Sequence, residues 1–174
     1  MSKLLENVVA IAAAEVGVTE EPPGSNQGKR VNEYLLSVGL GPGFSWCAAF
    51  IVWVYKRAYA GQLAGCPIVP TGGVMDHYRR APAKAKITAA QARANPALVR
   101  PGVIGILLLD KHTGAGHTYI VTGRNGVNLE TVEGNTAPAS AANAGTREGV
   151  GVFRLNRRKL TDKILVGFID YTLV

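Results

Sequence analysis

Residues 44–55 form an apolar run that contains no charged side chain, and this run limits the folds that the chain can adopt. A run that is apolar on every side has to be buried. It is shorter than the ~20 residues with which a helix crosses a bilayer. Its length and its adjacent alanines, Ala48 and Ala49, favour a buried central helix over a strand.

Periodic patterns on either side of this run predict an α+β domain. Apolar residues at helical spacing predict helices over residues 2–16 and 27–38, the second capped by Ser25 or Asn26. An alanine-rich stretch, residues 81–97, predicts a short surface helix. Alternating patterns then predict about five antiparallel strands and a surface loop. The strands are expected at residues 103–109, 117–122, 128–132, 149–155 and 166–171, and the loop at residues 134–145.

We expect a single domain. The chain has 174 residues, and its 47% apolar content can bury a core, which excludes a mainly disordered chain. No repeat or linker separates the helical part, about residues 1–97, from the sheet part, about residues 100–174, so no separate binding domain is expected. Glu6, Asn7 and Glu15 interrupt the first apolar stretch, so we predict no secretory signal and synthesis in the cytoplasm.

Cys47 is the first candidate for chemistry. It follows a Gly-Pro-Gly loop and stands one or two residues inside the predicted central helix, with Ser45 as the expected N-cap. The positive end of a helix favours an anion, so a thiol there is biased toward the nucleophilic thiolate. The free N–H groups can also hold the oxyanion of a tetrahedral intermediate. From the local sequence alone, a small buried core cysteine is an equally good interpretation.

Three polar residues farther along supply the partners that a cysteine nucleophile needs. His117 follows a Gly-Ala-Gly segment and opens an apolar strand, although an isolated histidine there would more often be structural. Glu133 and Asn135 come about sixteen residues later, and on their own they indicate a strand end that runs into a turn. If a strand beside that of His117 includes both, they point to the same face, because side chains alternate along a strand. One of them can then orient the imidazole, which completes a nucleophile–base–orienter triad.

These residues lie in three blocks that resemble the CHAP family, the cysteine- and histidine-dependent amidohydrolases and peptidases of peptidoglycan. The blocks read FSWCAAFIVW at residues 44–53, GHTYIV at residues 116–121 and VEGNT at residues 132–136. The segment VGVTEE, followed by Asn26 and Tyr34, is similar to the helical lead-in of a subgroup common in phage lysins. The resemblance spans most of the chain and implies a papain-like, NlpC-type fold, with the nucleophile beginning a central helix packed on the sheet.

By position, the resemblance makes Cys47 the nucleophile, His117 the general base and then acid, and Glu133 the residue that orients His117. Asn135 is then a supporting polar group, or the orienter if Glu133 points elsewhere. Some family members bind calcium through acidic residues just before the cysteine, but residues 39–46 contain no carboxylate. We therefore expect no metal, and we expect no other cofactor.

Four further residues receive weaker assignments. Trp46, beside the nucleophile, is a candidate wall of the substrate cleft. Glu20 and Asn26 are candidates for the same cleft, with a solvated loop as the simpler interpretation. Cys66 has no neighbouring base in the sequence, so we interpret it as a bystander thiol, and a disulfide between Cys66 and Cys47 would inactivate the site.

The function that the resemblance implies is cleavage of an amide bond in the peptide stem of peptidoglycan, as an N-acetylmuramoyl-L-alanine amidase or an endopeptidase. A phage endolysin released through a holin pore fits a small basic chain. An antibacterial effector delivered by a contact-dependent secretion system, with an immunity protein as partner, fits nearly as well. In both cases the site of action is the periplasm or the cell wall. A cytoplasmic cysteine protease or deamidase and an inactive wall-binding module are the remaining alternatives.

The net charge of +7 predicts an anionic partner or environment. Basic residues gather near the C-terminus, and no nucleic-acid-binding motif accompanies them. A solvated face is the default interpretation, and attraction to an anionic cell envelope is the more specific one. We expect a monomer. The basic residues are Arg154, Arg157, Arg158, Lys159 and Lys163.

Overall fold

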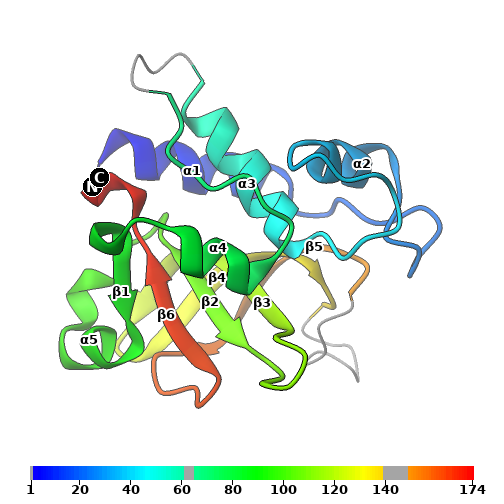
Figure 1. The fold of residues 1–174 in the computed structure, drawn as a ribbon. Coiled ribbons are helices and arrows are strands. Elements are labelled where there is room, and N and C mark those ends of the chain that lie inside the picture. The colour runs from blue at the N-terminus through cyan, green and yellow to red at the C-terminus, as the bar shows by residue number, and fades with distance from the viewer. Residues whose placement is uncertain (1, 61–64, 139–148) are drawn as a thin grey trace.

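The computed structural model describes residues 2–60, 65–138 and 149–174, which fold into helices packed on one antiparallel sheet (Figure 1). The α+β class is thereby confirmed. The helices are α1 (Lys3–Ala14), α2 (Lys29–Leu36), α3 (Cys47–Ala58), α4 (Val74–Arg80) and α5 (Ala89–Ala94). The strands are β1 (Lys86–Thr88), β2 (Ile104–Leu108), β3 (Gly116–Asn125), β4 (Asn128–Thr136), β5 (Gly151–Lys159) and β6 (Leu165–Ile169).

The sheet has six strands in the order β1-β6-β2-β3-β4-β5, and each neighbouring pair is antiparallel. β3 and β4 are therefore neighbours inside the sheet, joined by a short turn at Gly126. Because β3 and β4 run in opposite directions, the beginning of β3 and the end of β4 lie side by side at the same end of the strand pair. This arrangement brings together the two sequence blocks that contain His117 and Glu133.

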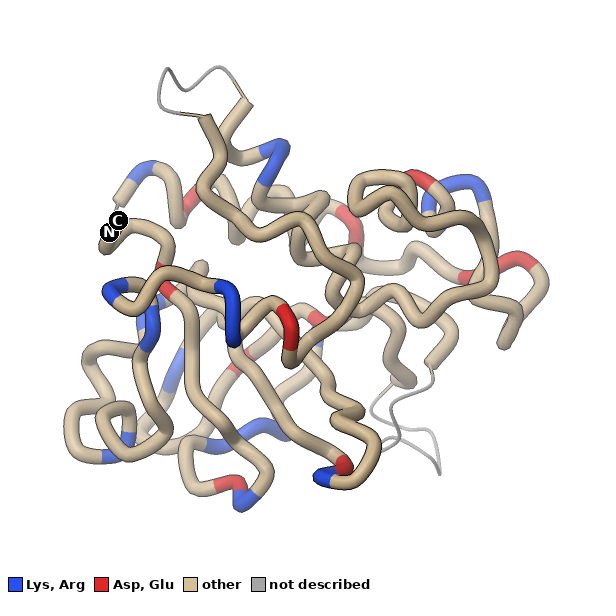
Figure 2. Tube along the Cα trace, in the orientation of Figure 1, with Lys and Arg blue, Asp and Glu red and all other residues tan. Residues whose placement is uncertain are grey.

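Positive charge is spread over the molecule rather than gathered at the C-terminal strands. Figure 2 shows Lys and Arg on several helices, strands and turns. On β5, Arg154 and Lys159 are exposed, whereas Arg158 is buried with 9% of its surface accessible. The expectation that all of the C-terminal basic residues form one solvated face is therefore wrong for Arg158.

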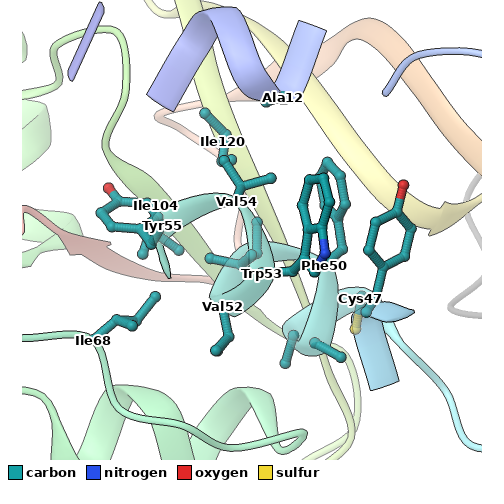
Figure 3. Packing of buried hydrophobic residues seen from close by; sticks show 14 of the residues in the cluster. Ala12, Cys47, Phe50, Val52, Trp53, Val54, Tyr55, Ile68, Ile104 and Ile120 are labelled. Carbon is teal, nitrogen blue, oxygen red and sulfur yellow. The ribbon is translucent and has the colours of Figure 1, made fainter. Parts of the chain in front are cut away.

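The apolar run forms the central helix α3, as its composition predicts. Every residue of α3 is buried except Lys56 and Arg57 in the last turn. α1 and α2 contact α3, which also contacts β3 and β4, and its apolar side chains point to several sides of the core (Figure 3). Burying one large apolar side chain contributes about 1.5–3 kcal/mol, so this helix is anchored from end to end.

The structure corrects several predicted elements. Residues 81–97 hold β1 and α5 instead of one helix, because Thr88 and Gln91 form a capping box that begins a new helix after the strand. The sheet accordingly has six strands, one more than expected. The helix α4 was not predicted. The N-cap of α2 is Gly28, not Ser25 or Asn26.

The predicted loop at residues 134–145 is wrong at its start, since β4 continues to Thr136. Residues 139–145 of that loop lie outside the described residues. Among the helices that the structure does describe, none has the length and apolarity needed to cross a membrane.

Candidate active site

Cys47 is the first residue of α3, and 3% of its surface is exposed. The N-cap is Trp46 rather than the expected Ser45, and the Trp46 side chain makes no capping hydrogen bond. The first N–H groups of an α-helix have no acceptor within the helix. Cys47 therefore lies at the positive end of α3, where free N–H groups can stabilise an oxyanion.

The loop before Cys47 is held by the three residues that were expected in the substrate cleft. Trp46 is fully buried, and its indole Nε1 donates to Glu20 Oε1 at 2.8 Å. Glu20 Oε2 accepts the backbone N–H of Asn26 at 3.1 Å. The Asn26 carbonyl accepts the N–H of Gly43 at 3.0 Å. None of the three lines the pocket at Cys47, and the contacts that they make support the loop.

A pocket of about 290 Å³ opens at Cys47. Five of the lining residues have a side chain no larger than a methyl group. A Cβ at Gly116 would lie 2.7 Å from the Leu107 carbonyl oxygen and 3.0 Å from Val74, so only glycine fits there. The five small residues are Gly72, Gly73, Gly114, Ala115 and Gly116, and the others are Leu40, Phe44, Ser45, Val74 and Thr113.

His117 and Glu133 are joined by a hydrogen bond in which Nε2 and Oε2 are 2.8 Å apart. Both side chains are buried, with 2% and 0% of their surface exposed. The other ring nitrogen, Nδ1, is also buried and has no hydrogen-bond partner among the described residues. Because Glu133 occupies Nε2, Nδ1 is the nitrogen that remains for the Cys47 thiol.

The surroundings of His117 favour its protonated form. Burial alone would lower the pKa of His117, but the nearby Cys47 thiol and the Glu133 carboxylate outweigh it and raise the pKa to about 9. Burial likewise opposes ionisation of Glu133, yet His117 and Arg158 hold the pKa of this carboxyl well below its usual range. The site therefore places an imidazolium between the cysteine and an ionised carboxylate.

Glu133 has two further partners that the sequence patterns did not reveal. Arg158 donates from Nε to Oε1 at 2.9 Å and from Nη2 to Oε2 at 2.7 Å. Thr131 Oγ1 donates to Oε1 at 2.8 Å. A buried carboxylate requires hydrogen-bond donors that compensate its charge. A basic residue on the neighbouring strand was the sequence signal that could have revealed Arg158. The β4–β5 pairing shifts register between Leu129 and Thr131. The residue of β5 that faces Glu133 therefore cannot be deduced by counting along the sequence.

Asn135 makes no hydrogen bond to His117 among the described residues. The register of β4 and β5 shifts again between Glu133 and Thr136, and Asn135 has a left-handed φ of 52°, so the simple alternation of side chains is broken. When the amide of Asn135 is oriented so that both its oxygen and its nitrogen have a partner, the oxygen accepts the Trp46 N–H at 3.2 Å and the nitrogen donates to the Gly149 carbonyl at 3.0 Å. Asn135 therefore ties the residue before Cys47 to the sheet, and Glu133 occupies the orienting position.

The other cysteine lacks these surroundings. Both cysteines are free, and burial raises the pKa of the Cys66 thiol, which disfavours its thiolate. Within the residues that the structure describes, no group of three or more His, Cys, Asp or Glu side chains is arranged to hold a metal ion.

Replacing Glu133 by alanine should destabilise the fold, because it leaves the Arg158 guanidinium buried without its carboxylate. Breaking a buried ion pair in this way costs about 3–5 kcal/mol. Urea unfolding of the Glu133→Ala variant measures this loss. Glu130→Ala, at an exposed position of the same strand, is the control and should remain within about 0.5 kcal/mol of the parent. Equal stability of the two variants would show that the buried pair contributes nothing.

Taken together, a thiol at a helix N-terminus, a protonated histidine and an ionised carboxylate are the parts required for nucleophilic acyl transfer. Comparison with protein-family models, curated proteins and solved structures found no match. The chemistry of Cys47, His117 and Glu133 is thus the main guide to function.

Proposed function

We propose that this chain is a peptidoglycan hydrolase of the CHAP type that cleaves an amide bond in the peptide stem. The observation that carries the proposal is Cys47 at the start of α3, next to the buried His117–Glu133 pair and open to a pocket of about 290 Å³. A papain-like fold belongs to the same proposal, because the nucleophile begins a central helix and the base lies on the adjoining sheet.

The proposed reaction is acyl transfer through a thioester. The Cys47 thiolate attacks the amide carbonyl, and the backbone N–H groups at the start of α3 stabilise the oxyanion. The tetrahedral intermediate collapses when His117 gives its proton to the departing amine. His117, now neutral, takes a proton from water, the resulting hydroxide attacks the thioester, and Cys47 leaves as thiolate. Glu133 holds the ring in place throughout.

The shape of the pocket supports a peptide substrate with small side chains. Glycine and alanine make up much of the wall, which leaves room for an extended backbone carrying methyl groups. The peptide stem of peptidoglycan is rich in alanine, so its amide bonds fit such a pocket. The net charge of +7 also favours association with anionic wall polymers, which is the setting of either an endolysin or a secreted effector.

The experiment that tests the proposal is a count of new primary amines released from purified sacculi. Cleavage of any amide in the stem, at the lactyl group, within the stem or at a cross-link, creates one amine for each bond cut. We expect amines to accumulate with the native protein. Release of ammonia without new amine termini would indicate a deamidase, and unchanged sacculi would overturn the proposal.

Activity should be lost on the alkaline side as pH rises through about 9, the pKa of His117 in the folded protein. The sign follows from the direction of the shift, because the imidazolium form that pairs with the thiolate persists up to that pH and disappears above it. The measurement is kcat/KM on soluble stem peptides as a function of pH. A fall of kcat/KM centred near pH 6.5, the ordinary pKa of histidine, would contradict the described electrostatics.

A further inference from the structure

We propose that Arg158 is a positioning residue of this site, holding Glu133 ionised and aimed at His117 so that the histidine stays protonated. The inference rests on the proposed roles of Cys47 and His117. It adds a fourth residue to the triad, one that acts only through Glu133.

The hydrogen bonds around Glu133 leave it no freedom to turn. Oε2 lies 2.8 Å from His117 Nε2 and 2.7 Å from Arg158 Nη2. Oε1 accepts from Thr131 Oγ1 at 2.8 Å and from Arg158 Nε at 2.9 Å. The two nitrogens of one rigid guanidinium therefore fix the plane of the carboxylate, and that plane presents Oε2 to the imidazole.

Burial explains why the carboxylate needs this partner. Glu133 is completely buried, and a buried carboxylate without a cation becomes protonated instead of remaining charged. Protonated Glu133 would no longer stabilise an imidazolium. Arg158 supplies the missing charge from β5 and is itself buried, and the Glu133 carboxylate raises the pKa of Arg158 although burial alone would lower it.

Other charged and titratable groups face this network from each neighbouring element. Cys47 from α3 acts on His117. Tyr119 from β3 lies under Arg158, with the guanidinium carbon 5.9 Å from its ring centroid. Arg157 donates to Thr136 Oγ1 at 2.8 Å instead of to Glu133. Asp162, beyond the end of β5, adds a favourable charge for Arg158. Among these groups, Arg158 is the cation that contacts the carboxylate.

The sign of the effect separates this role from simple charge repulsion. If Arg158 acted directly on His117, its removal would take away a like charge and raise the pKa of the histidine. If Arg158 acts through Glu133, its removal allows the carboxylate to become neutral, and the pKa of His117 falls by about one unit or more.

The test is an NMR titration of the His117 imidazole in full-length variants, which requires no substrate. Arg158→Met should move the titration midpoint to lower pH. Arg158→Lys keeps the charge but cannot donate to both oxygens from one plane, so its midpoint should lie between those of the parent and Arg158→Met. Arg124→Met, at an exposed position of β3, is the matched control and should leave the midpoint unchanged. An unchanged or raised midpoint in Arg158→Met would overturn the proposal.

A double variant keeps the test decisive if Arg158→Met does not fold. In Glu133→Gln, both the charge on the carboxylate and its influence on His117 are gone. Adding Arg158→Met to Glu133→Gln removes the buried pair as a whole, which is much milder than breaking it. We expect no further fall of the His117 midpoint in the double variant. A further fall, or a rise, would show that Arg158 acts by another route, and a rise is the result that direct charge repulsion gives. Because the readout is His117 itself, the result is independent of whether sacculi are cleaved.

Discussion

Replacing Cys47 by alanine should abolish amide cleavage, with the rate of amine release falling by about 10⁴-fold or more. The expectation follows from the place of the sulfur, at the positive end of α3 and next to His117, which supplies the base. Cys47→Ser should be nearly as inactive, because a serine hydroxyl is far less acidic than a thiol. Amine release from sacculi under saturating conditions measures the loss.

The matched control is the second cysteine. Cys66 is half-buried, and burial raises the pKa of its thiol, so Cys66→Ser should retain the parent rate. Equal loss in both cysteine variants would point to a disulfide or a shared structural role. Full activity in Cys47→Ala would show that Cys47 is not the nucleophile.

Replacing His117 by alanine should lower the rate by about 10²–10⁴-fold. The loss is large because His117 serves twice, first protonating the departing amine and then deprotonating the attacking water. Its imidazolium also stabilises the thiolate, so alkylation of Cys47 by iodoacetamide at pH 6 should slow by about tenfold or more. The two readouts separate catalysis from thiolate formation.

His112 provides the control for this second prediction, since it is exposed in the turn between β2 and β3. His112→Ala should keep both the rate and the alkylation profile of the parent. If His117→Ala retained rapid alkylation at pH 6 and lost only turnover, His117 would act as general acid and base without forming an ion pair with Cys47.

The central helix and the residues of the triad could be predicted because their signals are local. The length of the apolar run and its adjacent alanines favour a buried helix over a strand, and the Gly-Pro-Gly loop before the run marks where that helix begins. The block at His117 begins a strand, and the block at Glu133 ends one. The antiparallel pairing of β3 with β4 then brings the two together without any long-range information.

The residues that complete the site depend on tertiary contacts that no local pattern encodes. Arg158 faces Glu133 only because register shifts interrupt the pairing of β4 with β5, so strict alternation gives the wrong side for a residue on β5. The same irregularity turns Asn135 toward Trp46 and away from His117.

The contacts around the loop before Cys47 could not be predicted for a related reason. Polar residues such as Glu20 usually lie at the surface, but this carboxylate is buried because the indole of Trp46 supplies a donor from a distant part of the chain. A sequence indicates which residues are polar, and it does not indicate which of them find a buried partner.

If Cys47 and His117 hydrolyse an amide of the peptidoglycan stem, mass spectrometry of digested sacculi should identify the bond that is cut. Native protein should release fragments with one new amine and one new carboxylate at a single type of stem bond. The Cys47→Ala digest should contain none of them. Sacculi that yield no such fragments with the native protein, or the same fragments with Cys47→Ala, would contradict the account.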